Sequence, residues 1–291
     1  MKIKITSPLK MSWQNRLRYA TPGIVAVRAA EALAGLARLN SSMWSGDYGD
    51  WASAQAACRD YGLGPMCESY ARAYQAMAGE AGAFERDGRV MAAGSLDWPL
   101  LTACGALQAA GAQRLTVLDF GGGFASVYFQ HRAWLRAFPE VRWAVVEQAE
   151  VARQGRAVVK DPQVRFFERI EEAVACWGVP DLVCASGVIS QLPDPEGFLA
   201  EVAALRAAWF FADRIAQLEG EGRHWVARQK VPLVPYLAEG PFWFFDRDLF
   251  RAMLERHFRL AGAFESQVDE PGWLRGRRFQ FSGFLLQPLP A

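Results

Sequence analysis

The most constraining feature of the sequence is the stretch at residues 117–129, which reads VLDFGGGFASVYF. Apolar residues Leu115, Val117 and Leu118 come just before three consecutive glycines at 121–123, and an apolar-rich helical pattern follows. This order predicts a buried strand, a tight turn and the start of a helix. A unit of this kind is typical of the beginning of a Rossmann-like α/β sheet.

A second acidic residue lies where such a fold binds a nucleoside. Twenty-eight positions after Asp119, the apolar run at 143–146 ends in Glu147. In Rossmann-like folds a carboxylate placed in this way accepts hydrogen bonds from a ribose. The dinucleotide pattern Gly-x-Gly-x-x-Gly would begin at Gly121 and requires glycine or alanine at position 126, where this chain has Ser126. The two acids and the glycines therefore indicate a nucleoside cofactor other than a dinucleotide.

The overall composition is that of an ordinary globular protein. The chain has 291 residues, 52% of them hydrophobic, which suffices for one large domain or for a domain with a cap. Its net charge of +1 gives no general attraction to nucleic acid. Five cysteines without metal-ligand spacing and three histidines indicate neither a zinc site nor a disulfide framework. The start of the chain lacks the apolar centre of a signal peptide, so we expect a cytoplasmic protein without a membrane span.

The amino-terminal region differs from the rest in charge and pattern. Residues 1–43 contain seven lysines and arginines but one acidic residue, and residues 23–39 show an Ala/Leu-rich helical pattern. Such a helix must bury most of its surface, either on the rest of the chain or in a homodimer, and contact with a membrane surface is the less favoured alternative. Aromatic residues crowd positions 44–51, and Ser53 is a candidate cap for the helix that follows. With a further helix at 66–78, this predicts a helical cap over residues 1–100, ahead of a Rossmann-like domain over 101–291.

Beyond a helix at 98–110, the pattern alternates strands with helices. Strands are predicted at 115–119, 142–147, 164–167, 181–185 and 208–212, and helices at 124–138, 150–159, 168–177, 196–207 and 246–258. The alternation implies parallel strands joined by right-handed crossovers. Two strands without an intervening helix, at 259–265 and 278–286, end the chain. The connection at 213–241 has too few periodic apolar residues for one helix, and a connection of this length is usually functional or disordered.

Several motifs together resemble class I S-adenosylmethionine (SAM) methyltransferases, and more narrowly a methyltransferase-like family from bacterial polysaccharide and secondary-metabolite gene clusters. The resemblance covers residues 44–285. It rests on ERD at 85–87, VLDFGGG at 117–123, WAVVEQ at 143–148, residues 186–195, ADR at 212–214 and QKVP at 229–232. It implies a class I fold, in which a mostly parallel sheet ends in an antiparallel strand, and it implies SAM as the cofactor.

The resemblance also implies which residues contact the cofactor. Asp119 would lie near the methionine ammonium, and Glu147 would bind the ribose. Gln148 or the segment 167–170 would contact the adenine, and Ser186, at the end of the fourth strand, would face the sulfonium. The three glycines of the turn would let the backbone close on the methionyl part, namely Gly121, Gly122 and Gly123.

Methyl transfer is an in-line displacement at the sulfonium, so the enzyme aligns the acceptor and removes a proton from a hydroxyl or amine. Asp213, at the end of the fifth strand, is the best placed of the candidate bases, which also include Glu85, Asp87 and His224. Arg86, Arg214 and Arg228 could bind a carboxylate of SAM or of an acidic acceptor, or could form structural ion pairs. The Asn-Pro-Pro-Tyr signature of amino-methylating enzymes is absent after the fourth strand, so methylation of DNA or of protein glutamine has no support.

Four functions remain open from the sequence. The leading one is a SAM-dependent methyltransferase that acts on a small molecule or a sugar. The first alternative is an enzyme that cyclises SAM itself to azetidine-2-carboxylate and releases methylthioadenosine. The second is a nicotinamide-dependent oxidoreductase, which Ser126 disfavours, and the third is a non-catalytic SAM-fold subunit that binds a partner through residues 23–39.

Overall fold

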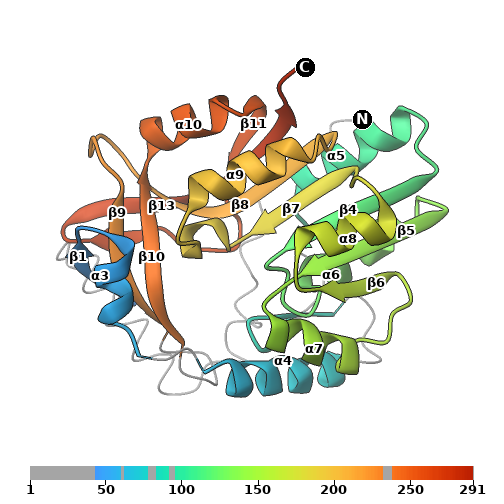
Figure 1. The fold of residues 1–291 in the computed structure, drawn as a ribbon, viewed down its shortest axis with the longest axis horizontal. Coiled ribbons are helices and arrows are strands. Elements are labelled where there is room, and N and C mark those ends of the chain that lie inside the picture. Colours follow the sequence, from blue (N-terminus) through green and yellow to red (C-terminus); the bar gives the residue numbers. More distant parts are fainter. Residues whose placement is uncertain (1–42, 60–61, 78–82, 92–95, 232–237, 291) are drawn as a thin grey trace, which may run out of the picture.

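The computed structural model describes residues 43–59, 62–77, 83–91, 96–231 and 238–290 (Figure 1). Within these residues, one mixed sheet of 11 strands crosses the molecule, and a separate two-stranded sheet forms a small hairpin. The predicted helix at 23–39, with its suggested role in a homodimer, lies outside the described residues. Of the helices in the described ranges, none is both long and apolar enough to span a membrane.

The centre of the large sheet is a parallel series in the order β6–β5–β4–β7–β8. Its members are β4 (Arg114–Phe120), β5 (Glu140–Val146), β6 (Val164–Phe167), β7 (Leu182–Ser186) and β8 (Trp209–Leu218). The chain runs from β4 outward to β6 and then returns to the other side of β4 as β7. The order therefore reverses between β4 and β7, and ligands of open α/β sheets bind at the carboxyl ends of the strands at such a point. The predicted parallel Rossmann-like sheet is confirmed.

Helices cover both faces of this series. On one face lie α5 (Trp98–Ala109), α6 (Ser126–Leu135) and α7 (Ala149–Val158), and on the other lie α8 (Ile170–Trp177), α9 (Pro195–Ala204) and α10 (Arg247–Glu255). Successive side chains of a strand point to opposite faces. In β4, accordingly, Val117 packs with the first group of helices and Leu118 with the second. Burial on both faces explains why these strands read as continuous apolar runs.

The last two long strands form the antiparallel pair that the sequence predicted. β11 (Phe258–Glu265) pairs with β13 (Arg277–Pro288), and β13 also pairs with β8, antiparallel in both cases. The short β12 (Gly272–Leu274) pairs with β13 as well. The sheet is therefore mostly parallel in its centre and ends with an antiparallel β13 inserted between β8 and β11, as in the class I methyltransferase fold.

Residues 213–241 differ from the prediction of an irregular connection. β8 continues to Leu218, and β9 (Trp225–Val231) and β10 (Ala238–Asp246) follow as an antiparallel pair. β10 also pairs in parallel with the last residues of β8, which joins this insertion to the main sheet (Figure 1). The strand pattern of β9 was missed because the charged Arg228 and Lys230 interrupt its apolar residues.

The described part of residues 1–100 contains strands as well as the predicted helices. β1 (Trp44–Tyr48) pairs with β9, and the Trp44 indole packs against aromatic rings of β10. The crowded aromatic segment therefore adds an edge strand to the insertion. Next come α3 (Trp51–Ala56) and α4 (Leu63–Met77), and then the hairpin of β2 (Phe84–Arg86) and β3 (Arg89–Met91). α4 packs against α7 and this hairpin, at the lower edge of the view in Figure 1.

In three helices of the described residues, the side chain of an aspartate caps the first turn. Asp194 caps α9 and Asp246 caps α10, since each carboxylate accepts hydrogen bonds from amides in the first turn of its helix. The prediction of Ser53 as a cap is wrong. Asp50 caps α3, and its carboxylate accepts from the Ser53 amide at 2.7 Å. Asp and Ser are both good caps, and the extended backbone at residue 50 decides between them.

Candidate functional site

The glycine turn follows β4 at the point where the strand order reverses. The Gly121 amide donates to the Val146 carbonyl at the end of β5, across 2.9 Å. Gly121 and Gly123 have φ angles of +70° and +58°, a left-handed conformation that favours glycine. A Cβ on Gly121 would come within 2.7 Å of the Val188 side chain, which follows β7. The turn is thus held between the carboxyl ends of β5 and β7.

Gly122 lies directly over the carboxylate of Asp119. A Cβ at position 122 would lie 2.4 Å from Asp119 Oδ2, so any larger residue meets this carboxylate. The Asp119 side chain is 1% exposed, and its Oδ2 accepts a hydrogen bond of 2.9 Å from Trp143 Nε1. Its Oδ1 has no hydrogen-bond partner among the described residues. Burial raises the pKa of Asp119 to about 7, against the opposing effect of donation from Trp143 and Cys184.

Glu147 reaches the same turn from the end of β5. Its Oε1 accepts from the Gly123 amide at 3.1 Å, and its Oε2 accepts from the Gln148 amide at 2.9 Å. Burial raises the pKa of Glu147, and the hydrogen bonds from the Gln148 and Gly123 amides lower it. Gln148 is exposed and precedes the first turn of α7. The structure therefore brings together the two acids and the glycines that the sequence had singled out.

Ser186 and Asp213 end the pairing between β7 and β8. They are partners in the register of the two parallel strands, and the Gly187 amide donates to the Asp213 carbonyl at 3.0 Å. The Asp213 side chain is 2% exposed, and its Oδ1 accepts from the Arg214 amide at 2.7 Å. Burial, followed by the nearby Asp97 carboxylate, raises the pKa of Asp213 to about 7, although Arg214 opposes this shift.

Arg214 makes an ion pair with two other segments. Its Nε and Nη2 donate to Asp269 at 2.6 and 3.1 Å, and its Nη2 lies 3.6 Å from Asp87. Asp87 and Arg214 both have positive φ angles, of 51° and 62°. Asp87 is in the turn between β2 and β3, and Asp269 is between β11 and β12. Of the roles predicted for Arg214, this geometry supports the structural ion pair.

Glu85 and Arg86 extend from β2 toward α6. Glu85 is 1% exposed, its Oε1 accepts from the Gly88 amide at 2.8 Å, and its Oε2 accepts from Ser126 Oγ at 3.2 Å. Burial raises the pKa of Glu85 to about 8. Arg86 Nη2 donates to Gln130 of α6 at 2.6 Å. These contacts tie the hairpin to the helix after the glycine turn, and they give Ser126, which breaks the dinucleotide pattern, a partner of its own.

Two of the predicted candidates lie away from this cluster, in the insertion. The His224 ring accepts from the Asp246 amide through Nδ1 at 3.1 Å and packs against Phe245, and burial lowers the pKa of His224. Arg228 donates to Ser45 Oγ and to the Ala57 carbonyl, each at 3.3 Å. His224 therefore joins two parts of the insertion, and Arg228 joins the insertion to the chain before it.

Residues that the sequence reasoning did not place at the site also contact it. Trp143 and Val188 meet Asp119 and Gly121 as described, and the Tyr70 ring of α4 lies 3.4 Å from a Cβ built on Gly123. Tyr70 packs edge-on against Phe124, just before α6, with ring centroids 5.6 Å apart, so α4 lies against the end of the glycine turn. No pattern in the sequence signals the Trp143 contact, because it joins two strands. Among the described residues, no cluster of His, Cys, Asp and Glu could hold a metal ion.

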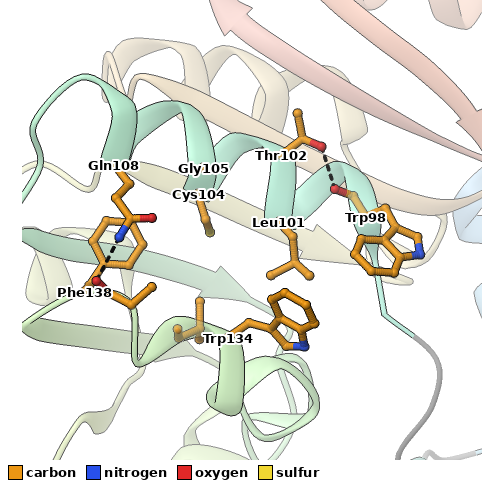
Figure 2. Close-up of a pocket in the computed structure, with 10 residues that line it drawn as sticks. Trp98, Leu101, Thr102, Cys104, Gly105, Gln108, Trp134 and Phe138 are labelled. Atoms are coloured by element: carbon orange, nitrogen blue, oxygen red, sulfur yellow. Dashed lines mark hydrogen bonds between the residues drawn. The ribbon is translucent and has the colours of Figure 1, made fainter. Parts of the chain in front are cut away.

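A surface hollow of about 310 Å³ lies elsewhere, between α5 and α6 (Figure 2). The half-exposed Trp98 and Trp134 stand at one end of it, with ring centroids 6.0 Å apart, and Gln108 and Phe138 stand at the other. None of its lining residues belongs to the glycine turn or to the acids around it. The hollow is therefore separate from the candidate site.

No family model matches the sequence, and no curated protein matches it. Among solved structures, the chain is similar to the amino-terminal domain of EvdMO1 with SAH bound, at 16% identity over 76% of this chain and 97% of that chain, with a TM-score of 0.47. It is also similar to a SAM-dependent methyltransferase from Clostridium acetobutylicum, at 8% identity over 66% of this chain and 91% of that chain, with a TM-score of 0.41. A third is the glycopeptide N-methyltransferase MtfA complexed with SAM, at 13% identity over 67% of this chain and 96% of that chain, with a TM-score of 0.42. With all three scores below 0.5, the fold class rests on this chain's own strand order.

Proposed function

We propose that this protein is a SAM-dependent methyltransferase with a small molecule or a sugar as its acceptor. The observation that carries the proposal is the contact between Glu147 Oε1 and the Gly123 amide, at 3.1 Å, at the switch point of the sheet. It places a carboxylate suited to ribose hydroxyls beside a glycine turn that admits a close ligand. The resemblance of these motifs to class I methyltransferases supports SAM as the ligand.

The chain's own groups suit the parts of this cofactor. Glu147 would accept hydrogen bonds from the ribose hydroxyls, with its carboxylate oriented by the Gly123 and Gln148 amides. Residues 121–123 would border the methionyl part, and Ser186 stands at the end of β7, two residues before the Val188 side chain that meets Gly121. When bound, SAM supplies an electrophilic methyl group on its sulfonium.

Asp213 is the proposed general base. It is the register partner of Ser186, and its pKa of about 7 suits a group that accepts a proton near neutral pH. In the reaction, the acceptor oxygen or nitrogen would form a bond to the methyl carbon as the bond from carbon to sulfur breaks. The acceptor proton would pass to the Asp213 carboxylate, and S-adenosylhomocysteine (SAH) would be left as the product.

The first experiment measures SAH binding by isothermal titration calorimetry. Glu147→Ala is expected to weaken binding by about 1.5–3 kcal/mol, the usual contribution of hydrogen bonds to a charged partner. Glu150→Ala is the matched control, since Glu150 is an acid of the adjacent helix whose partners are the exposed Arg153 and the half-buried Gln154. Equal affinities for the wild type and Glu147→Ala would place the ribose elsewhere, and a wild type that binds neither SAM nor SAH would refute the proposal.

A second experiment follows the products from SAM alone by mass spectrometry. The proposal expects intact SAM in the absence of an acceptor. Formation of methylthioadenosine with a cyclic amino acid, faster than in buffer, would instead identify SAM as its own substrate. It would contradict a methyltransferase function.

A further inference from the structure

The indole of Trp143 is buried behind the glycine turn and touches no part of the proposed reaction. It is 0% exposed in β5, and the Tyr128 ring of α6 packs on it at 5.6 Å between centroids. Its Nε1 donates to Asp119 Oδ2 at 2.9 Å. Because Trp143 is in register with Val117, the indole reaches forward along β4 to the carboxylate two residues later. The packing thus fixes the direction of a single N–H group.

The carboxylate that receives this hydrogen bond has few other donors. Asp119 Oδ1 has no hydrogen-bond partner among the described residues. Two neighbouring groups also act on the pKa of Asp119: hydrogen bonding with the thiol of Cys184, its register partner on β7, lowers it, and the Glu147 carboxylate at the end of β5 raises it by repulsion. Burial raises the pKa of Asp119 most strongly, and Trp143 and Cys184 are the two donors that lower it. Removal of either donor therefore favours the protonated acid.

The position of this carboxylate also matters for the backbone above it. A Cβ on Gly122 would lie 2.4 Å from Oδ2, so the turn and the carboxylate are already in close contact. A negative charge at this place favours a ligand that brings a cation to the turn, such as the ammonium group of SAM or SAH.

We propose that Trp143 is a positioning residue, which holds the Asp119 carboxylate beneath Gly122 in the orientation and charge state that bind the cofactor. The inference rests on the proposed function, because cofactor binding is its readout. Trp143 itself contacts no ligand and acts through Asp119.

The test measures SAH affinity against pH by calorimetry for four proteins. Trp143→Phe keeps a buried aromatic ring but lacks the N–H, and the pH at which binding is half-maximal is expected to rise by about one unit, because the ionised acid loses a donor. Cys184→Ser puts a stronger donor at the same place, so its midpoint is expected to fall. Trp44→Phe is the control, since Trp44 is 3% exposed and its Nε1 has no hydrogen-bond partner among the described residues.

The outcomes separate this inference from the proposed function. A wild type that binds no SAH at any pH rejects the methyltransferase proposal itself. A wild type that binds, together with a Trp143→Phe profile that superimposes on it, overturns the inference about Trp143. If Trp143→Phe does not fold, Cys184→Ser decides, and a midpoint that stays or rises in this variant overturns the inference.

Discussion

Replacement of Gly122 by alanine tests how closely the glycine turn is packed on Asp119. The added Cβ would lie 2.4 Å from Asp119 Oδ2, and ordinary contact begins near 3.4 Å, so the two must separate by about 1 Å. A shift of that size lengthens the 2.9 Å bond from Trp143 to the carboxylate beyond hydrogen-bonding range. The residue at 122 has no positive φ angle, so steric contact rather than backbone strain is the cause.

The expected change in the free energy of unfolding combines the lost hydrogen bond with the effect of alanine on the unfolded chain. Loss of a hydrogen bond to a charged group costs about 1.5–3 kcal/mol, and the lower conformational entropy of the unfolded alanine variant offsets about 0.5–1 kcal/mol of this. We therefore expect Gly122→Ala to lower the free energy of unfolding by about 1–2 kcal/mol. Any overpacking that remains after the shift would increase this loss. Urea denaturation at constant pH measures the change.

A double-mutant cycle with Asp119→Ala identifies the cause. In the Asp119→Ala background the contact is gone, so the same glycine substitution is expected to cost less than about 0.5 kcal/mol. Gly105→Ala, in α5, is a control with no atom within 4 Å of the new Cβ, and it should leave stability unchanged or slightly raised. An equal cost of Gly122→Ala in both backgrounds would refute the role given to the carboxylate.

Two further predictions concern the other buried carboxylates. Asp213→Asn is expected to slow SAH production with a suitable acceptor by about 10²–10⁴-fold, the usual contribution of a general base, while SAH binding is kept, and full activity would remove Asp213 as the base. Glu85 keeps its proton in the folded chain up to about pH 8, whereas the unfolded chain releases it near pH 4.5, so the folded state binds more protons and loses stability as the pH rises between these values. Glu85→Gln should flatten this decline between urea midpoints at pH 5.5 and 8, and a decline as steep as that of the wild type would contradict the assignment.

The sequence predicted the parallel half of the fold and much of its site because both depend on local patterns. Strands buried on both faces form continuous apolar runs, and the distance from Asp119 to Glu147 spans one strand–helix–strand unit. The spacing along the chain therefore sufficed to place both acids at one edge. The antiparallel end of the sheet was predicted from two successive strands without an intervening helix, together with the resemblance to class I methyltransferases.

The contacts that the sequence did not predict are those between distant segments. The pair of Arg214 and Asp269 joins residues 55 positions apart, and the bond from Trp143 to Asp119 joins two strands. Neither contact produces a periodic pattern of apolar residues in the sequence. The strands of the insertion were missed because β9, which lies between β1 and β10, carries charges such as Lys230 where a strand buried on both faces would carry apolar residues.

Opposite β13, the other edge of β8 has two different neighbours, which divide the molecule into regions that can diverge separately. Its first half, up to Asp213, is in register with β7, and its last residues, Gln217 and Leu218, are in register with β10. Between the part of β8 that pairs with β7 and the part that pairs with β10, the Ala216 amide donates to Ser190 Oγ at 3.4 Å. Asp213 is thus positioned by its pairing with β7, and its position does not depend on β9 and β10, which follow Leu218. An evolving or engineered chain can exchange the insertion without disturbing the glycine turn.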